Sequence, residues 1–173
     1  MTTYFGKNCH TRMKLHPNGK FLYTYGGTDN TINRYDVDSQ KLVDVIEMPS
    51  AEGAEVSALT FSSDGKLLYA TGSVRGIDSV FGIARIDDNH AWDQMTILCD
   101  LEIVDMQVAI DDPGLIYALG RGQGLFFLHP ALFLDENKPR PIPAYAFNAI
   151  GHMAIDEKRA SAFCTSQSDK NAD

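Results

Sequence analysis

The chain has 173 residues, of which 44% are hydrophobic and 22% are charged, a composition typical of a globular domain that buries a core. Its formal net charge of −8 argues against a nucleic-acid groove, where phosphates require clustered Lys and Arg. No run of 18 apolar residues and no signal-peptide pattern occurs in the sequence, so we expect no membrane span.

Three widely spaced cysteines, Cys9, Cys99 and Cys164, form no CxxC or zinc-type cluster. Each lies in or beside an expected strand, where a free Cys behaves as a small buried apolar residue. This cysteine usage favours a reducing, cytoplasmic compartment. The alternatives are one disulfide plus one free thiol, and a periplasmic or extracellular location. We expect neither a metal nor a cofactor.

In chain order, the first four strands are expected at 12–16, 21–25, 31–36 and 42–48. Pro17-Asn-Gly-Lys20 presets the turn between the first two strands. Later strands, assigned by the same alternation of apolar and polar residues, are expected at 56–61, 67–71, 80–86, 95–101, 104–110, 115–119, 124–128, 144–147, 150–156 and 160–164. The proline-rich stretch 130–143 is expected to protect a sheet edge, the alternative being a polyproline segment that a partner recognises.

One pattern recurs along the chain with a period of about 46 residues, which indicates a repeat architecture. It is clearest in Leu59-Thr-Phe-Ser-Ser-Asp-Gly-Lys-Leu-Leu-Tyr-Ala-Thr-Gly72. The copies begin at Met13, at Val108 with one residue fewer, and at Met153. Their aligned aromatic residues are Tyr23, Tyr69, Tyr117 and Phe163.

This pattern, with Asp29-Asn-Thr-Ile-Asn-Arg-Tyr-Asp36 closing a repeat, resembles the β-propeller repeats of the WD and YVTN type. The resemblance covers about 150 residues. Where a WD repeat carries Trp-Asp, this chain has Tyr35-Asp36, Ile86-Asp87 and Leu128-His129. The YVTN-like and lactonase-like blades are therefore the better match.

The resemblance implies an all-β propeller of about three and a half four-stranded blades. The expected parts are a lead-in at 1–9, blades at 10–54, 55–102 and 103–148, a partial blade at 149–166 and a polar tail at 167–173. A propeller closes by joining its last blade to its first, so this chain would leave two open faces. We expect the ring to be incomplete unless another chain or further blades complete it, and the isolated chain to oligomerise or aggregate. The alternative is a compact four-bladed ring that uses residues 1–8.

Charged connections are the candidate binding features. Asp29, Arg75, Asp78 and Arg121 follow second strands and would project at one end of the propeller, where such loops bind partners. Trp92, the only tryptophan, is expected at a connection, either exposed as an interface anchor or tucked against the sheet edge. The alternative for the charged residues is a solvated loop.

No catalytic motif is present: the sequence lacks GxSxG, and the five histidines have no metal-ligand spacing. The histidines are His10, His16, His90, His129 and His152. We therefore expect a non-enzymatic module that acts as a protein-interaction scaffold through its end loops, although fold alone does not give function. The alternatives are part of a lactonase-like or quinoprotein dehydrogenase-like enzyme and a repeat module of a secreted or surface protein.

Overall fold

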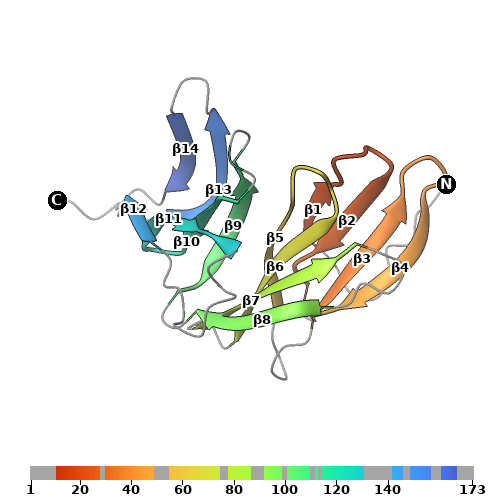
Figure 1. The fold of residues 1–173 in the computed structure, drawn as a ribbon, viewed down its shortest axis with the longest axis horizontal. Coiled ribbons are helices and arrows are strands. Elements are labelled where there is room, and N and C mark those ends of the chain that lie inside the picture. The colour runs from red at the N-terminus through yellow and green to blue at the C-terminus, as the bar shows by residue number, and fades with distance from the viewer. Residues whose placement is uncertain are drawn as a thin grey trace.

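The computed structural model describes most of the chain, and every regular element in the described part is a β-strand (Figure 1). The described residues are 11–27, 30–48, 55–74, 78–86, 92–98, 101–109, 112, 114–130, 142–145, 149–156 and 161–166. Within these ranges no helix is long and apolar enough to cross a membrane.

The described strands form three four-stranded antiparallel sheets and one two-stranded sheet, here called blades 1 to 4. Blade 1 contains β1 (Arg12–Leu15), β2 (Phe21–Tyr25), β3 (Thr31–Asp36) and β4 (Lys41–Glu47). Blade 2 contains β5 (Glu55–Phe61), β6 (Leu67–Val74), β7 (Asp78–Arg85) and β8 (Trp92–Leu98). Blade 3 contains β9 (Ile103–Val108), β10 (Ile116–Gly120), β11 (Gly124–Leu128) and β12 (Ile142–Tyr145), and partial blade 4 contains β13 (Ala149–Asp156) and β14 (Ser161–Ser166). Each sheet pairs consecutive strands in chain order, which confirms the expected all-β fold of three and a half blades.

The first two blades begin with the same hairpin, as their shared turn sequence predicts. His16 N–H donates to the Phe21 carbonyl at 2.9 Å, and Ser62 N–H donates to the Leu67 carbonyl at 3.0 Å. Gly19 at φ +73° occupies the left-handed conformation in the first turn, and its counterpart Gly65 adopts φ +71° in the second. Only glycine adopts these angles without strain.

The third repeat has a register that differs from the sequence alignment. The repeat tyrosines oppose Lys14, Thr60 and Gln107 in the three complete blades. Met106, and not Val108, therefore occupies the position of Met13 and Leu59. The hairpin that closes between Ala109 and Leu115 is one residue longer than its counterparts, not shorter, so an alignment based on the later glycine misplaces the first strand.

Other strand boundaries also differ from expectation. The β6–β7 hairpin extends into the expected connection 72–79, because Val74 and Asp78 continue the ladder. The strand β8 begins at Trp92 rather than after it, and β12 lies earlier than expected. Pro143, which has no N–H to donate, lies in β12 at the outer edge of its sheet, and 131–141 of the proline-rich stretch lie outside the described residues.

The apolar core lies between the blades. We call the face of a blade that packs on the following blade its front face, and the opposite one its back face. The core between blades 1 and 2 joins Tyr23, Tyr25, Ile32 and Ile46 to Val56, Leu59, Phe61 and Leu68. The core between blades 2 and 3 joins Ala58, Tyr69, Phe81 and Ile83 to Ile103, Met106, Ile116 and Leu128, and a smaller one joins Val104 and Leu119 to Met153.

Corresponding positions in the blades differ in exposure according to whether a neighbouring blade is present. On the back face, Met13 is 69% exposed, whereas its counterparts Leu59 and Met106 are fully buried. On the front face, Tyr23 is fully buried against blade 2, whereas its counterpart Phe163 in the last blade is 64% exposed. Within the described residues, the back of blade 1 and the front of blade 4 are thus left uncovered. The alternative four-bladed ring would use residues 1–8, which lie outside the described ranges.

Candidate functional site

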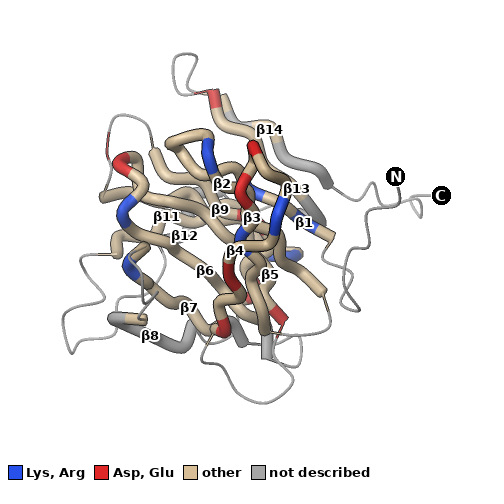
Figure 2. The backbone as a smooth tube through the Cα atoms, turned by 90° about the vertical axis from the view of Figure 1, so that its right-hand side faces the viewer, with Lys and Arg blue, Asp and Glu red and all other residues tan. Residues whose placement is uncertain are grey.

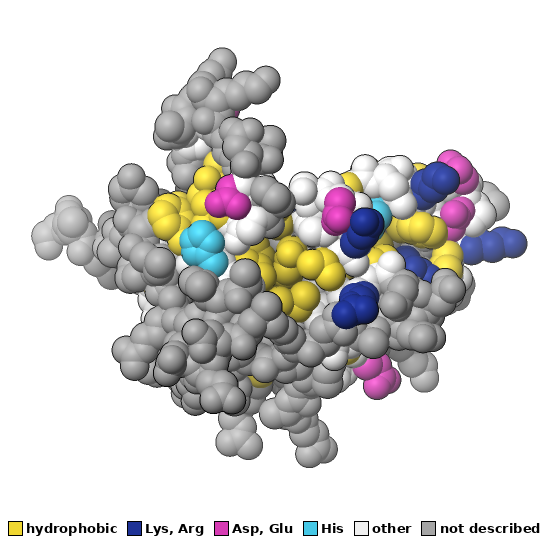
Figure 3. All heavy atoms as spheres, in the orientation of Figure 1, with side chains coloured by type: hydrophobic (Ala, Val, Ile, Leu, Met, Phe, Trp, Pro, Cys, Tyr) yellow, Lys and Arg dark blue, Asp and Glu magenta, His cyan; other side chains and the backbone are white. Residues whose placement is uncertain are grey.

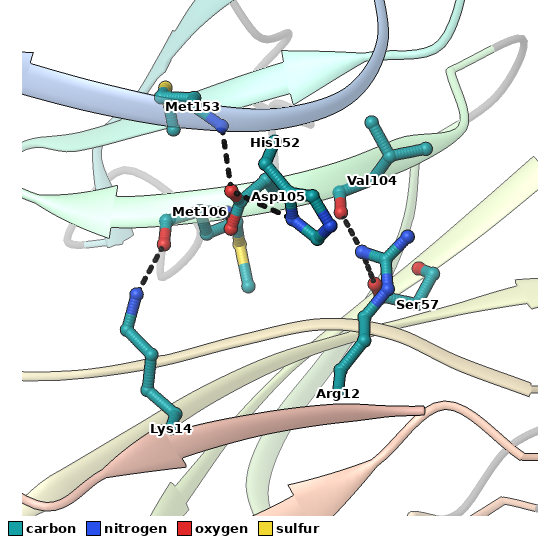
Figure 4. A network of polar contacts seen from close by, with 8 residues as sticks. All are labelled: Arg12, Lys14, Ser57, Val104, Asp105, Met106, His152 and Met153. Atoms are coloured by element: carbon teal, nitrogen blue, oxygen red, sulfur yellow. Dashed lines mark hydrogen bonds and ion pairs between the residues drawn. The ribbon is translucent and has the colours of Figure 1, made fainter. Parts of the chain in front are cut away.

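The first strands of blades 2, 3 and 4 lie side by side, and basic side chains of β1 reach the backbones of blades 2 and 3 (Figure 4). Arg12 Nη1 donates to the Ser57 carbonyl of blade 2 at 2.8 Å and also to the Val104 carbonyl of blade 3. Lys14 Nζ lies 3.4 Å from the Met106 carbonyl of blade 3. One side chain of blade 1 therefore contacts the backbones of two other blades.

An acidic side chain provides the corresponding link from blade 3 to blade 4. Asp105 Oδ2 accepts the Met153 N–H at 2.9 Å, and Asp105 Oδ1 accepts the Met106 N–H at 2.9 Å. His152 Nδ1 lies 3.8 Å from Asp105 Oδ2 (Figure 4). Both carboxylate oxygens thus bind backbone donors.

Tyr25 lies in the same region and is only 3% exposed. Burial and, to a smaller extent, the Asp105 carboxylate raise the pKa of its hydroxyl to about 12, against the opposing effects of the Arg12 guanidinium and a hydrogen bond with the Leu59 backbone. The phenol is therefore neutral at physiological pH, so it does not add a negative charge beside Asp105.

The expected end-loop residues have different positions. Asp29 and Arg75 lie outside the described residues. Asp78 was expected in a connection, but it is the first residue of β7 and opposes Val74. The Arg121 side chain is 53% exposed, and its Nε lies 2.8 Å from Glu102 Oε1, so this guanidinium is at the surface but paired.

Trp92 was expected in a connection and instead begins β8. Its indole N–H donates to the Glu47 carbonyl of blade 1 at 2.8 Å, and its ring packs on the core between blades 1 and 2. Of the two environments considered for this residue, the structure shows the one tucked against a sheet edge.

No protein-family model and no curated protein matches the chain. Solved structures do match. The crystal structure of the RRP9 WD40 repeats gives a TM-score of 0.59 at 12% identity, over 94% of this chain and 52% of that chain. Kuenenia stuttgartiensis hydrazine synthase gives a TM-score of 0.61 at 14% identity, over 86% of this chain and 41% of that chain. The chain is an incomplete β-propeller.

The propeller spans about half the length of the first of these structures and less of the second. The charged residues of its first strands connect the blades. Arg12 and Lys14 contact carbonyls of blades 2 and 3, and Asp105 accepts a hydrogen bond from an amide of blade 4. Within the described ranges, no group of three or more His, Cys, Asp or Glu side chains is placed to hold a metal. The arrangement links the blades.

These charged residues of the first strands were not identified from the sequence. Arg12, Asp105 and His152 occupy one repeat position, with Ala58 in blade 2, as the pairing with the repeat aromatics shows. Charged residues at the same repeat position in the first strands of three blades were a signal that could have found them. The misplaced start of the third repeat hid it, because Gln107 rather than Asp105 then aligned with Arg12 and His152.

Replacing Trp92 by phenylalanine is expected to lower the free energy of unfolding of this propeller by about 1 kcal/mol. The change removes the indole N–H that binds the Glu47 carbonyl and keeps an aromatic ring on the core. Urea unfolding followed by far-UV circular dichroism measures the loss, since the variant has no tryptophan fluorescence. An unchanged midpoint would show that water replaces this hydrogen bond at no cost.

Proposed function

We propose that this propeller is a non-enzymatic protein-binding module and that its uncovered blade faces bind further propeller blades. The observation that supports the proposal most strongly is the exposure of Met13, at a position where Leu59 and Met106 are buried by a preceding blade. Leu15 is likewise exposed, whereas its counterpart Phe61 is buried.

The back of blade 1 continues across the sheet as a surface whose charged residue is Glu47, at one end of β4. Met13 opposes Thr24, Leu15 opposes Leu22, and Asn33 opposes Val45. The exposed β4 side chains Leu42, Val43 and Val45 extend it toward the outer edge. Figure 2 views the molecule from the blade 1 end, whereas Figure 3, in the orientation of Figure 1, shows hydrophobic side chains reaching the surface at the centre of the molecule.

A solvated sheet face normally alternates with the core so that polar side chains face outward. Here Met13 and Leu15 on the outward face are apolar, like Leu59 and Phe61 on the buried back face of blade 2. Contiguous apolar surface of this kind is typical of a protein interface. A blade is the partner that this surface fits, because a blade covers each corresponding surface within the chain.

We further propose that the blades are of the YVTN-like or lactonase-like type, with the boundaries expected from the sequence. The end residues Asp29, Arg75, Asp78 and Arg121 form a second binding surface of the module in this proposal. The half-exposed Arg121 side chain supports that role, whereas the position of Trp92 assigns it to the junction of blades 1 and 2.

Changing Met13 to glutamate is expected to release the protein from its complex without unfolding it. The charge would face a desolvated partner surface, but in the free chain it faces water. The native size of the full-length protein in extracts of cells that produce it, measured by size-exclusion chromatography with immunodetection, should fall for this variant.

The matched control is Leu59→Glu, which places the same charge at the same repeat position within the core. This variant is expected to lose more than about 4 kcal/mol of stability and fail to fold. A wild-type protein that already elutes at the size of one chain, or a Met13→Glu variant that keeps the wild-type complex, would contradict the proposed function.

A further inference from the structure

We propose that the partner of the back face of blade 1 is the front face of blade 4 in a second copy of this chain. The inference rests on the proposed function, since it names the blade that covers the open surface. Two copies arranged head to tail would complete one ring.

The blade 1–blade 2 junction shows what a back face binds. Tyr23 on the front of blade 1 lies edge to face against Phe61 on the back of blade 2, with ring centroids 4.9 Å apart. Such a pair adds to the energy of simple apolar burial. An open back face, whose Leu15 occupies the Phe61 position, therefore fits a front face with an aromatic residue on its second strand.

Within its described residues, the chain itself carries such a front face that no blade covers. Phe163 on β14 is the counterpart of Tyr23, and it opposes Ala154 on β13, which is also exposed. Neither residue is charged, and neither are Met13 and Leu15 on the proposed partner surface. The repeat thus supplies both halves of a blade junction, one at each end of the described part of the chain.

The two faces differ, so their contact is heterologous and must close by rotation or propagate into a chain of copies. This propeller contains four blade positions and covers 52% of the RRP9 WD40 repeat chain. A second copy therefore supplies about the other half of a ring. Two identical junctions use both open faces of both copies, which favours a closed dimer over an open filament.

The experiment measures the mass of the purified full chain by size-exclusion chromatography with light scattering at several concentrations. The wild type is expected at about twice the 19.1 kDa of one chain. Met13→Glu and Phe163→Glu are each expected to raise the dimer dissociation constant at least tenfold, because either change alters both junctions of a ring. Val37→Glu, a change at an exposed turn residue outside both faces, is expected to leave the mass unchanged.

Mixing the two variants in equal amounts tests the head-to-tail arrangement. The intact front of Met13→Glu and the intact back of Phe163→Glu are expected to form a heterodimer with one junction, detectable by native mass spectrometry. A Phe163→Glu variant that still dimerises alone would overturn the proposal in favour of a back-to-back contact. Matching circular dichroism spectra and unfolding midpoints would show that the variants are folded.

A monomeric wild type would also overturn the second-copy proposal. The proposed function would survive that result if Met13→Glu still released the protein from its complex in cell extracts, since another chain would then supply the blade. Failure of both experiments would remove both proposals.

Discussion

Replacing Gly65 by alanine is expected to lower the free energy of unfolding by about 3 kcal/mol, whereas the same change at Gly19 costs about 1 kcal/mol. Both glycines adopt left-handed angles in corresponding turns, so the backbone strain of alanine is the same. A Cβ on Gly19 would have no atom within 4 Å. A Cβ on Gly65 would lie 2.7 Å from His16 Cε1 in the neighbouring blade.

The His16 ring is held by contacts on every side and has little room to move. Its Nε2 donates to the Gly65 carbonyl at 2.9 Å, and its Nδ1 accepts the Asn18 N–H at 3.2 Å. The ring packs edge on against Phe61 at 5.0 Å and is nearly parallel to Tyr23 at 6.1 Å. Moving the ring to admit a methyl group would break the bond between the two turns and disturb the core.

Guanidinium chloride unfolding followed by Trp92 fluorescence measures both losses, and this single tryptophan lies at the junction concerned. The variant Gly19→Ala reports the backbone strain alone. In a His16→Ala background the added cost of Gly65→Ala should fall to that of Gly19→Ala, which gives a coupling energy of about 2 kcal/mol. Equal losses at the two glycines in the wild-type background would show that the ring moves aside freely.

The fold could be predicted from the sequence because its information is local. A turn such as Pro17-Asn-Gly-Lys20 and the alternation of the strands each depend on neighbouring residues, and the recurrence of these local patterns about every 46 residues gives the repeat. The resulting count of blades is confirmed. Even the turn role of His16 follows from its alignment with Ser62.

The contacts between blades could not be predicted in this way, because they depend on distances across the ring. Ser62 occupies the position of His16, yet its hydroxyl donates to Asp64 within its own turn at 2.7 Å, whereas His16 reaches another blade. The Arg12 contacts likewise join residues that the repeat pattern treats separately. A local pattern predicted each blade, but not the side chains that join the blades.

Replacing Arg12 by methionine is expected to lower the free energy of unfolding by about 2 kcal/mol. The change keeps most of the apolar stem and removes the charged donor shared by the Ser57 and Val104 carbonyls, and hydrogen bonds from charged groups exceed neutral ones in strength. The residue is only half-buried, so water partly replaces the lost donor and limits the effect. Lys14→Met, which removes one long contact at 3.4 Å, is expected to cost less than about 1 kcal/mol.

Equilibrium unfolding measures the loss, and native-state hydrogen exchange shows where it acts. Because Arg12 links the first strands of blades 1, 2 and 3, amides of β1 and β9 should exchange faster in the methionine variant, while those of β6 and β7, held within one sheet, should not change. Arg12→Lys should recover no more than half of the loss, since the shorter lysine side chain does not bring its ammonium to the position of Arg12 Nη1, the one atom that donates to both carbonyls. Full recovery by lysine, or a uniform rise in exchange across all strands, would mean that Arg12 supplies charge or general stability rather than a specific bridge between blades.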